Sequence, residues 1–327
     1  MRLSLSSFMV RVSSAVLLGS GLVGCWDVIG SQEPNPPISA MADTNAPVPD
    51  VESPAPVAPA PVEVERGDDE DDEPVTMLVV VDQLLFPRVS EDGLTAPGYD
   101  LDGRISGDDD VQSCGQKDLL SPTGEKGIDN QLATLIPLME IVGLGAFETL
   151  VQRSIEEGGL LLMLEFGGID DLVNDPEVTM TIRLGAGTPL LGTNGLLLAG
   201  QTFDPHPETP DALSPARIEN GVVIANHFET RIPIVVFGVL YELHVKKAQF
   251  RATITADGGL EAGLLGGGVP MTDLIAIAQK ANNADDSILA AVQTVVGGAA
   301  DLDRDGDGEC RLLSTAIEIT AVAAYLQ

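Results

Sequence analysis

The chain of 327 residues carries 50 acidic and 17 basic side chains, a formal net charge of −33. A polyanion of this kind is repelled by the phosphate backbone, which argues against nucleic acid as a partner. Hydrophobic residues make up 44 % of the sequence, so the chain is able to bury a sizeable core. Length alone indicates two domains, although a β-rich domain can reach about 250 residues undivided.

The first 24 residues are typical of an export signal. Arg2 and Arg11 supply positive charge, and residues 12–23 form an apolar stretch too short for a membrane span. An ordinary signal peptide is one interpretation.

The stretch ends in Leu22-Val23-Gly24-Cys25, which resembles the lipobox of bacterial lipoproteins. The resemblance implies cleavage before Cys25, a diacylglycerol on its thiol and an acyl chain such as palmitate on its amine. Because Trp26 rather than an aspartate follows, it implies an outer-membrane lipoprotein, on the periplasmic face or the cell surface.

Residues 25–74 are expected to form a disordered linker behind the lipidated N-terminus. Residues 31–74 hold ten of the 22 prolines and twelve acidic residues against one arginine. Such a segment cannot bury enough apolar surface to offset its chain entropy, and its charge keeps it extended.

A single β-rich domain is expected over residues 75–327, and it begins with a buried strand at Val75. An acidic, glycine-containing loop follows at residues 100–110. The 3, 4 spacing of apolar residues from Ile128 to Val142 predicts a helix, with Asp129 or Asn130 as its N-cap. A second helix is expected over residues 146–157.

Alternating apolar residues predict a series of strands after residue 159. The clearest lie at residues 160–166, 178–184 and 247–255, and others are expected at 195–201, 221–226, 231–241 and 260–265. One dry and one wet face on successive strands indicate an antiparallel sheet, and we expect a β-sandwich-like domain with a few helices.

The C-terminal part is expected to add two short helices and a last strand. The helices span residues 271–282 and 286–296. Residues 314–325 are compatible with a helix because of their alanines, but Thr315, Ile317 and Ile319 favour a closing strand.

Three segments resemble an uncharacterised group of secreted or lipid-anchored domains from myxobacteria and their relatives. They are Gly98-Tyr-Asp-Leu-Asp-Gly103, Gly127-Ile-Asp-Asn-Gln-Leu132 and the final strand that follows Cys310. The resemblance implies a secreted β-rich domain and no particular activity.

A run of alternating carboxylates near the C-terminus predicts a calcium site. Asp301, Asp303 and Asp305 with Gly306 resemble the opening of a DxDxDG calcium loop, in which alternate side chains converge on one ion. Leu312 stands where an EF-hand has its bidentate glutamate, so a shorter loop completed from elsewhere is expected. The further ligands expected are Asp307, Glu309, Asp100 and Asp102. A solvated acidic turn is the alternative for both loops.

With Cys25 lipidated, Cys114 and Cys310 remain in a compartment that permits oxidation, and we expect them to form a disulfide. The bond would bring the two acidic loops together. Because like charges at short distance raise each other's pKa unless a cation intervenes, a structural Ca²⁺ is expected between them.

Enzyme signatures such as a GxSxG elbow, an HExxH helix or a phosphate loop do not occur. Glu165 and Glu242 are the carboxylates that a glycoside hydrolase would need at a fixed distance. Three classes stay open: a non-catalytic surface lipoprotein that binds an unknown protein, glycan or lipid; a hydrolase with a loop-carboxylate site; and a lipid-handling module. The first is preferred.

The lipobox generates the first testable prediction. Replacing Cys25 by Ala removes the acceptor thiol, so the variant is expected to leave the detergent phase for the aqueous phase, since acyl chains are what hold a lipoprotein to the membrane. Intact mass of the native chain should show the cleaved signal and the added acyl groups. A variant that still partitions into detergent would refute the anchor.

Overall fold

The computed structural model describes residues 74–140, 147–207, 211–236, 239–281, 297–304 and 306–327. The expected signal peptide, Cys25, the linker, Asp305 and the helix expected over residues 286–296 lie outside the described residues. In this described part, no helix has both the length and the apolar character needed to cross a membrane.

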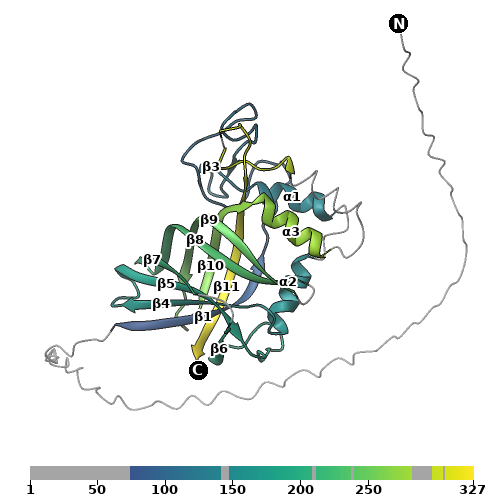
Figure 1. The fold of residues 1–327 in the computed structure, drawn as a ribbon. Helices are drawn as coiled ribbons and strands as arrows, with labels where there is room; N and C mark the ends of the chain where they lie inside the picture. Colours follow the sequence, from purple (N-terminus) through teal and green to yellow (C-terminus); the bar gives the residue numbers. More distant parts are fainter. Residues whose placement is uncertain (1–73, 141–146, 208–210, 237–238, 282–296, 305) are drawn as a thin grey trace, which may run out of the picture. The chain divides into compact units, whose positions relative to one another are not determined.

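The described domain is built mainly of strands, with three helices at its side (Figure 1). In chain order the elements are β1 (Val75–Leu85), β2 (Leu119–Leu120), β3 (Lys126–Ile128), α1 (Gln131–Met139), α2 (Phe147–Glu156), β4 (Leu161–Ile169), β5 (Asn174–Ala186), β6 (Gln201–Pro205), β7 (Ala212–Glu219), β8 (Val222–Val236), β9 (Val239–Ile254), β10 (Leu260–Pro270), α3 (Met271–Ala281) and β11 (Leu312–Leu326).

Eight of these strands form a closed antiparallel barrel. They follow one another in the order β1, β4, β5, β7, β8, β9, β10 and β11, and β11 pairs back onto β1. The short strand β6 runs parallel to β11 and pairs antiparallel with the end of β5. The antiparallel prediction is confirmed and the sandwich prediction is wrong. Alternation shows which face of a strand is dry, but it does not show whether the two edges of the sheet meet.

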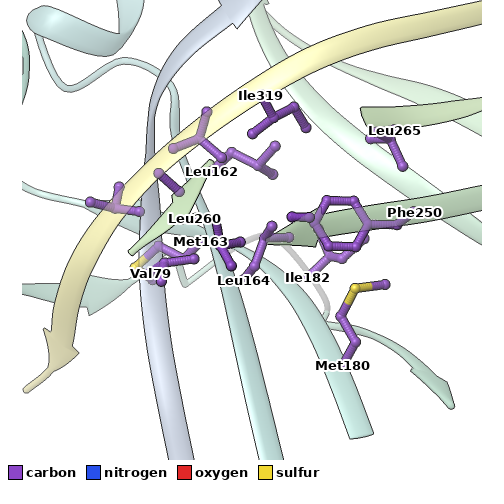
Figure 2. Close-up of a cluster of buried hydrophobic side chains, with 14 of the residues drawn as sticks. Val79, Leu162, Met163, Leu164, Met180, Ile182, Phe250, Leu260, Leu265 and Ile319 are labelled. Carbon is purple, nitrogen blue, oxygen red and sulfur yellow. The ribbon is translucent and has the colours of Figure 1, made fainter. Parts of the chain in front are cut away.

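The domain has a core of closely packed apolar side chains (Figure 2). Phe166 and Phe250 are at most 1 % exposed, and their rings stack with centroids 6.4 Å apart. Met163, Met180 and Val79 lie in the same cluster and are fully buried. This agrees with the general size of an eight-stranded barrel, whose interior is just wide enough for its own side chains.

The helices and the last strand agree closely with the sequence. The first helix is capped by Asn130, whose side chain accepts from the Ala133 N–H at 3.2 Å, and the strand chosen for the C-terminus is β11. Two expectations are wrong. Residues 195–200 lie in a loop before β6, and β8 and β9, at residues 222–236 and 239–254, are longer than the strands expected there. The predicted strands are too short because the pairing of β8 with β9 has register shifts between Asn226 and Thr230, which interrupt the alternation of apolar residues.

Residues 86–130, here called the cap, connect β1 to α1 and pack against the barrel. Tyr99 donates from its hydroxyl to the Leu264 carbonyl at 2.8 Å, and the Arg251 guanidinium lies 5.3 Å from the centre of its ring. The ring needs Gly266 beneath it, since a Cβ there would lie 2.6 Å from Tyr99 Cδ2. The cap also contributes a small core of its own, formed by Ala96, Leu119 and Ile128 with Ala133 of α1.

The packed core generates a stability prediction. Truncation of Phe250 to Ala removes a ring with 1 % exposure and leaves a cavity, so the free energy of unfolding should fall by about 3–5 kcal/mol. Leu213→Ala, at a side chain that is 68 % exposed, should change it by less than about 0.5 kcal/mol. Urea unfolding of the three chains measures both, and equal losses in the two variants would contradict the packing described here.

Candidate metal centre

Three aspartate side chains converge where the cap meets the start of α1. Asp100 and Asp102 lie in the loop after Tyr99, and Asp129 lies between β3 and α1. Each offers one carboxylate oxygen, and these oxygen atoms all lie within 4.8 Å of one another. Asp129 is 4 % exposed, Asp102 is half-buried and Asp100 is exposed.

The backbone brings these residues together. The Asp129 N–H donates to the Tyr99 carbonyl at 2.8 Å, in an antiparallel bridge between the two residues. This contact joins two of the three segments on which the family resemblance rests. The sequence therefore contains a signal for Asp129, which it predicts only as a helix cap, because it does not show that the two segments pair.

Hydrogen bonds from the backbone orient all three carboxylates. Asp129 Oδ2 accepts from the N–H groups of Leu101 at 2.7 Å and Asp102 at 3.3 Å. Asp100 Oδ1 accepts from Gly103 N–H at 2.6 Å, and Asp102 Oδ1 accepts from Arg104 N–H at 2.9 Å. The cluster is therefore held in place by the fold, without any contribution from an ion.

Gly127 permits the close approach of the two loops. It has a φ of +83°, and a Cβ built there would lie 2.7 Å from the Arg104 carbonyl oxygen and 3.4 Å from Asp100 Oδ2. Any side chain at this position would strain the backbone and clash with the Arg104 carbonyl, in the loop that carries Asp100 and Asp102.

Burial and mutual repulsion make the cluster costly to ionise. Burial raises the pKa of Asp129 to about 8, and the charges of Asp102, Asp301 and Asp118 add to this, against the bond from the Leu101 N–H. Burial also raises the pKa of Asp118. The hydrogen bond from the Ser106 N–H lowers this pKa in part, and the charges of Asp102 and Asp100 raise it further. Arg104 relieves part of the repulsion, with its Nη2 2.6 Å from Asp110 and its Nε 3.8 Å from Asp102.

A hard divalent cation is the ligand that suits such a cluster. It offers oxygen atoms and neither thiolate nor imidazole, which is the donor set of Ca²⁺, Mg²⁺ and Mn²⁺. A bound cation would also reverse the electrostatics, because it stabilises the ionised carboxylates that repel each other in its absence.

The disulfide prediction is confirmed. Cys114 and Cys310 are bonded, with Cα atoms 6.1 Å apart and a sequence separation of 196. The chain-entropy model gives about 5 kcal/mol of stabilisation for a loop of this length, as an upper figure. The bond fixes the residue 301–309 loop beside the cap, as expected.

The structure describes all residues of the predicted 301–309 calcium loop except Asp305. Asp301 is buried, and its carboxylate accepts from Ser314 N–H at 2.8 Å and from Ser314 Oγ at 2.5 Å. Ser314 Oγ in turn accepts from the Gln131 N–H at 2.8 Å, so Asp301 links β11 to the start of α1.

Burial and local hydrogen bonds shape the described part of that loop. Burial raises the pKa of Asp301 to about 7, against its bonds from Ser314 and with the charge of Asp118 adding to it. Asp303 has a φ of +56°, and the Arg304 Nε donates to the Gly308 carbonyl at 3.0 Å. A role for Asp301, Asp303, Asp305, Asp307 and Glu309 as ligands stays a prediction.

The carboxylates considered for glycoside hydrolysis are each paired with a separate arginine. Glu165 lies 3.2 Å from Arg183 on the neighbouring strand β5, and Glu242 lies 3.3 Å from Arg231 on β8. Each of the two glutamates is therefore paired with a cation on the adjacent strand.

No protein-family model, no curated protein and no solved structure matches the chain. The site defines the class only as an antiparallel barrel with a carboxylate cluster at its cap. The resemblances to lipoproteins and to the myxobacterial group stay predictions.

The pKa of Asp129 generates a prediction on pH dependence. An unfolded aspartate has a pKa near 3.9, so between about pH 4 and 8 the folded chain holds a proton that the unfolded chain has released. Stability in chelator should therefore be highest near pH 4 and fall as the pH rises to 8, on the order of 2–4 kcal/mol.

Asp129→Asn should flatten this profile, because the amide is neutral throughout, and it should be more stable than the wild type at pH 8. Urea unfolding at several pH values, with metal removed, measures both. The control is Asp109→Asn, at an exposed residue outside the cluster, which should keep the wild-type profile. Parallel profiles for the wild type and Asp129→Asn would contradict the prediction.

Proposed function

We propose that this chain is a lipid-anchored envelope protein whose barrel domain is stabilised by Ca²⁺ and serves as a non-catalytic binding or structural module. The observation that carries the proposal is the convergence of Asp100, Asp102 and the buried Asp129 between the cap and α1. The lipid anchor rests on the lipobox at Cys25.

The geometry favours calcium among the hard cations. Calcium binds oxygen atoms at about 2.3–2.6 Å, so two of its ligand atoms lie no more than about 5 Å apart. The three carboxylate oxygens, all within 4.8 Å of one another, satisfy this limit. Magnesium needs a tighter, near-ideal octahedron at about 2.0–2.1 Å, which carboxylates held at separations of up to 4.8 Å fit less well.

The ion would act as a clamp. Asp129 immediately precedes the Asn130 cap of α1, and Leu135 of that helix packs with Leu313 of β11. An ion that binds both Asp100 and Asp129 therefore connects the cap loop, through α1, to the closing strand of the barrel. Asp301 accepts from Ser314 Oγ, which accepts from the N–H of Gln131, so Asp301 lies beside the start of α1. The residue 301–309 loop is therefore the segment from which further ligands would come.

A hydrolase is the second candidate, favoured by the raised pKa values of Asp129 and Asp118, since such carboxyls can act as general acids. A groove of about 390 Å³ lies between the cap and strands β1, β9, β10 and β11, and Arg251 and Glu318 are among its lining residues. None of the clustered aspartates lines this groove, so it does not supply them with a substrate pocket. A lipid-handling role has less support still, because side chains fill the core of the barrel.

Thermal unfolding tests the calcium site. With a dissociation constant on the order of 0.1–1 mM and calcium a hundredfold above it, linkage adds about 2.7 kcal/mol. For a domain of this size the melting temperature should rise by about 5–10 °C relative to chelator. Asp102→Asn should remove most of this increase.

Two variants make the test specific. Asp109→Asn keeps the increase if the three-aspartate cluster is the site, because Asp109 lies outside it. Asp303→Ala separates the two acidic loops: it removes the increase only if the residue 301–309 loop supplies ligands. If the melting temperature of the wild type is the same in calcium and in chelator, the calcium site is refuted and both acidic loops are solvated turns.

A further inference from the structure

The loop between β5 and β6 holds apolar side chains out in solvent. Leu190 is 65 % exposed, Leu198 46 % and Leu191 41 %. Exposed leucines that stand singly are ordinary, but several on one loop mark an interaction surface. Tyr325, 61 % exposed, lies at the root of this loop, because β11 pairs Tyr325 with Thr202 of β6.

The same loop carries no charge. The twenty residues between Arg183 and Asp204 form the longest uncharged run in a sequence that is 20 % charged overall. Four charged residues would be expected there at the average composition. Within a strongly acidic chain, this loop therefore brings no charged side chain of its own into a low-dielectric environment.

The leucines are exposed by a rigid loop rather than by a loose one. Leu197 points inward, is 4 % exposed and belongs to the main core cluster. The Gln201 side chain accepts from Leu190 N–H at 2.5 Å and donates to the carbonyls of Leu190 and Leu198. These bonds hold the loop in the conformation that exposes the leucines, so the loop loses little conformational entropy when a partner binds.

The loop also pairs several of its own backbone donors within itself. The Gly192 N–H donates to the Leu196 carbonyl at 2.8 Å, and the Leu198 N–H donates to the Leu190 carbonyl at 3.0 Å. The Leu196 N–H donates to the Asn194 side chain at 3.2 Å, and the Gly195 N–H donates to the Gly192 carbonyl at 3.0 Å. Internal pairing of this kind is what a segment needs where water is scarce, as in a lipid interface.

We propose that residues 190–198, here called the leucine loop, insert into a lipid surface and form a second membrane contact beside the acyl anchor. The proposal rests on the proposed anchoring at Cys25. The fifty residues from 25 to 74 span at most about 170 Å, which leaves the domain free to bring any face to the bilayer. Tethering raises the local concentration of the loop at the membrane, so a weak insertion suffices. Tyr325 at its root suits the headgroup level, where tyrosine is enriched.

Vesicle flotation tests the leucine loop separately from the anchor. The chain from residue 25 on, carrying Cys25→Ala, is mixed with vesicles of phosphatidylcholine and phosphatidylethanolamine, which lack the net charge that would repel it. The chain is expected to float with the vesicles, and Leu190→Gln with Leu198→Gln should weaken the partition about tenfold. Leu94→Gln, at a cap leucine that is 42 % exposed, is the matched control and should leave it unchanged.

A second readout locates the contact. The emission of an environment-sensitive dye on Thr193→Cys should shift to the blue when vesicles are added, and that of the same dye on Thr123→Cys in the cap should not.

Absence of flotation, or equal flotation of the leucine variants and the parent, overturns the proposal. So does vesicle-independent self-association that the leucine variants abolish, which would assign the surface to a second copy of this chain. None of these measurements depends on acylation, so failure of the anchor shows separately, in the intact mass of the native protein. Flotation in chelator as well as in calcium keeps the result independent of the metal site.

Discussion

The pairing of the first strand with the last is the constraint on which the rest of the structure depends. Val79 on β1 lies opposite Ala323 on β11, and Leu85 lies opposite Glu318. Because the strands are antiparallel, the chain leaves β1 at the place where it later enters β11. The cap and the residue 301–309 loop therefore share one region of the molecule, and Cys114 meets Cys310 there although 196 residues separate them.

This convergence concentrates acidic side chains from distant parts of the sequence. Asp118 and Asp129 belong to the cap segment, whereas Asp301 precedes β11, and each of the three has its pKa raised by burial and by at least one acidic neighbour. Arg104 lies at the edge of this group and offsets only part of its repulsion, so backbone pairing and the disulfide hold the like charges together. The same bonds keep the carboxylates oriented for a cation, so the electrostatic strain and the proposed site have one origin.

Local patterns in the sequence were sufficient for the features that depend on near neighbours. The spacing of apolar residues located α1, α2 and α3, the threonines and isoleucines of residues 314–325 indicated a strand, and the count of cysteines gave the disulfide. Closure of the barrel could not be predicted, since the alternation in β1 and in β11 is the same whether or not these strands meet. Asp100 and Asp102 of the candidate site were predicted, but the buried carboxylate of Asp129 was not, because its neighbour across the β-bridge, Tyr99, is 30 residues away.

The position of the disulfide has a mechanical consequence. Both cysteines lie inside the pair of closing strands, because Cys114 follows β1 and Cys310 precedes β11. A pull on the N-terminus against the C-terminus would load β1 first and peel it from β11, because the start of β1 and the end of β11 lie at the same end of this antiparallel pair. Extension would then stop at Cys114, since every strand from β2 to β10 lies within the covalent loop. Under such a load only residues 75–113, fewer than forty, would extend on the tethered side. The part of the chain inside the disulfide loop would not lengthen.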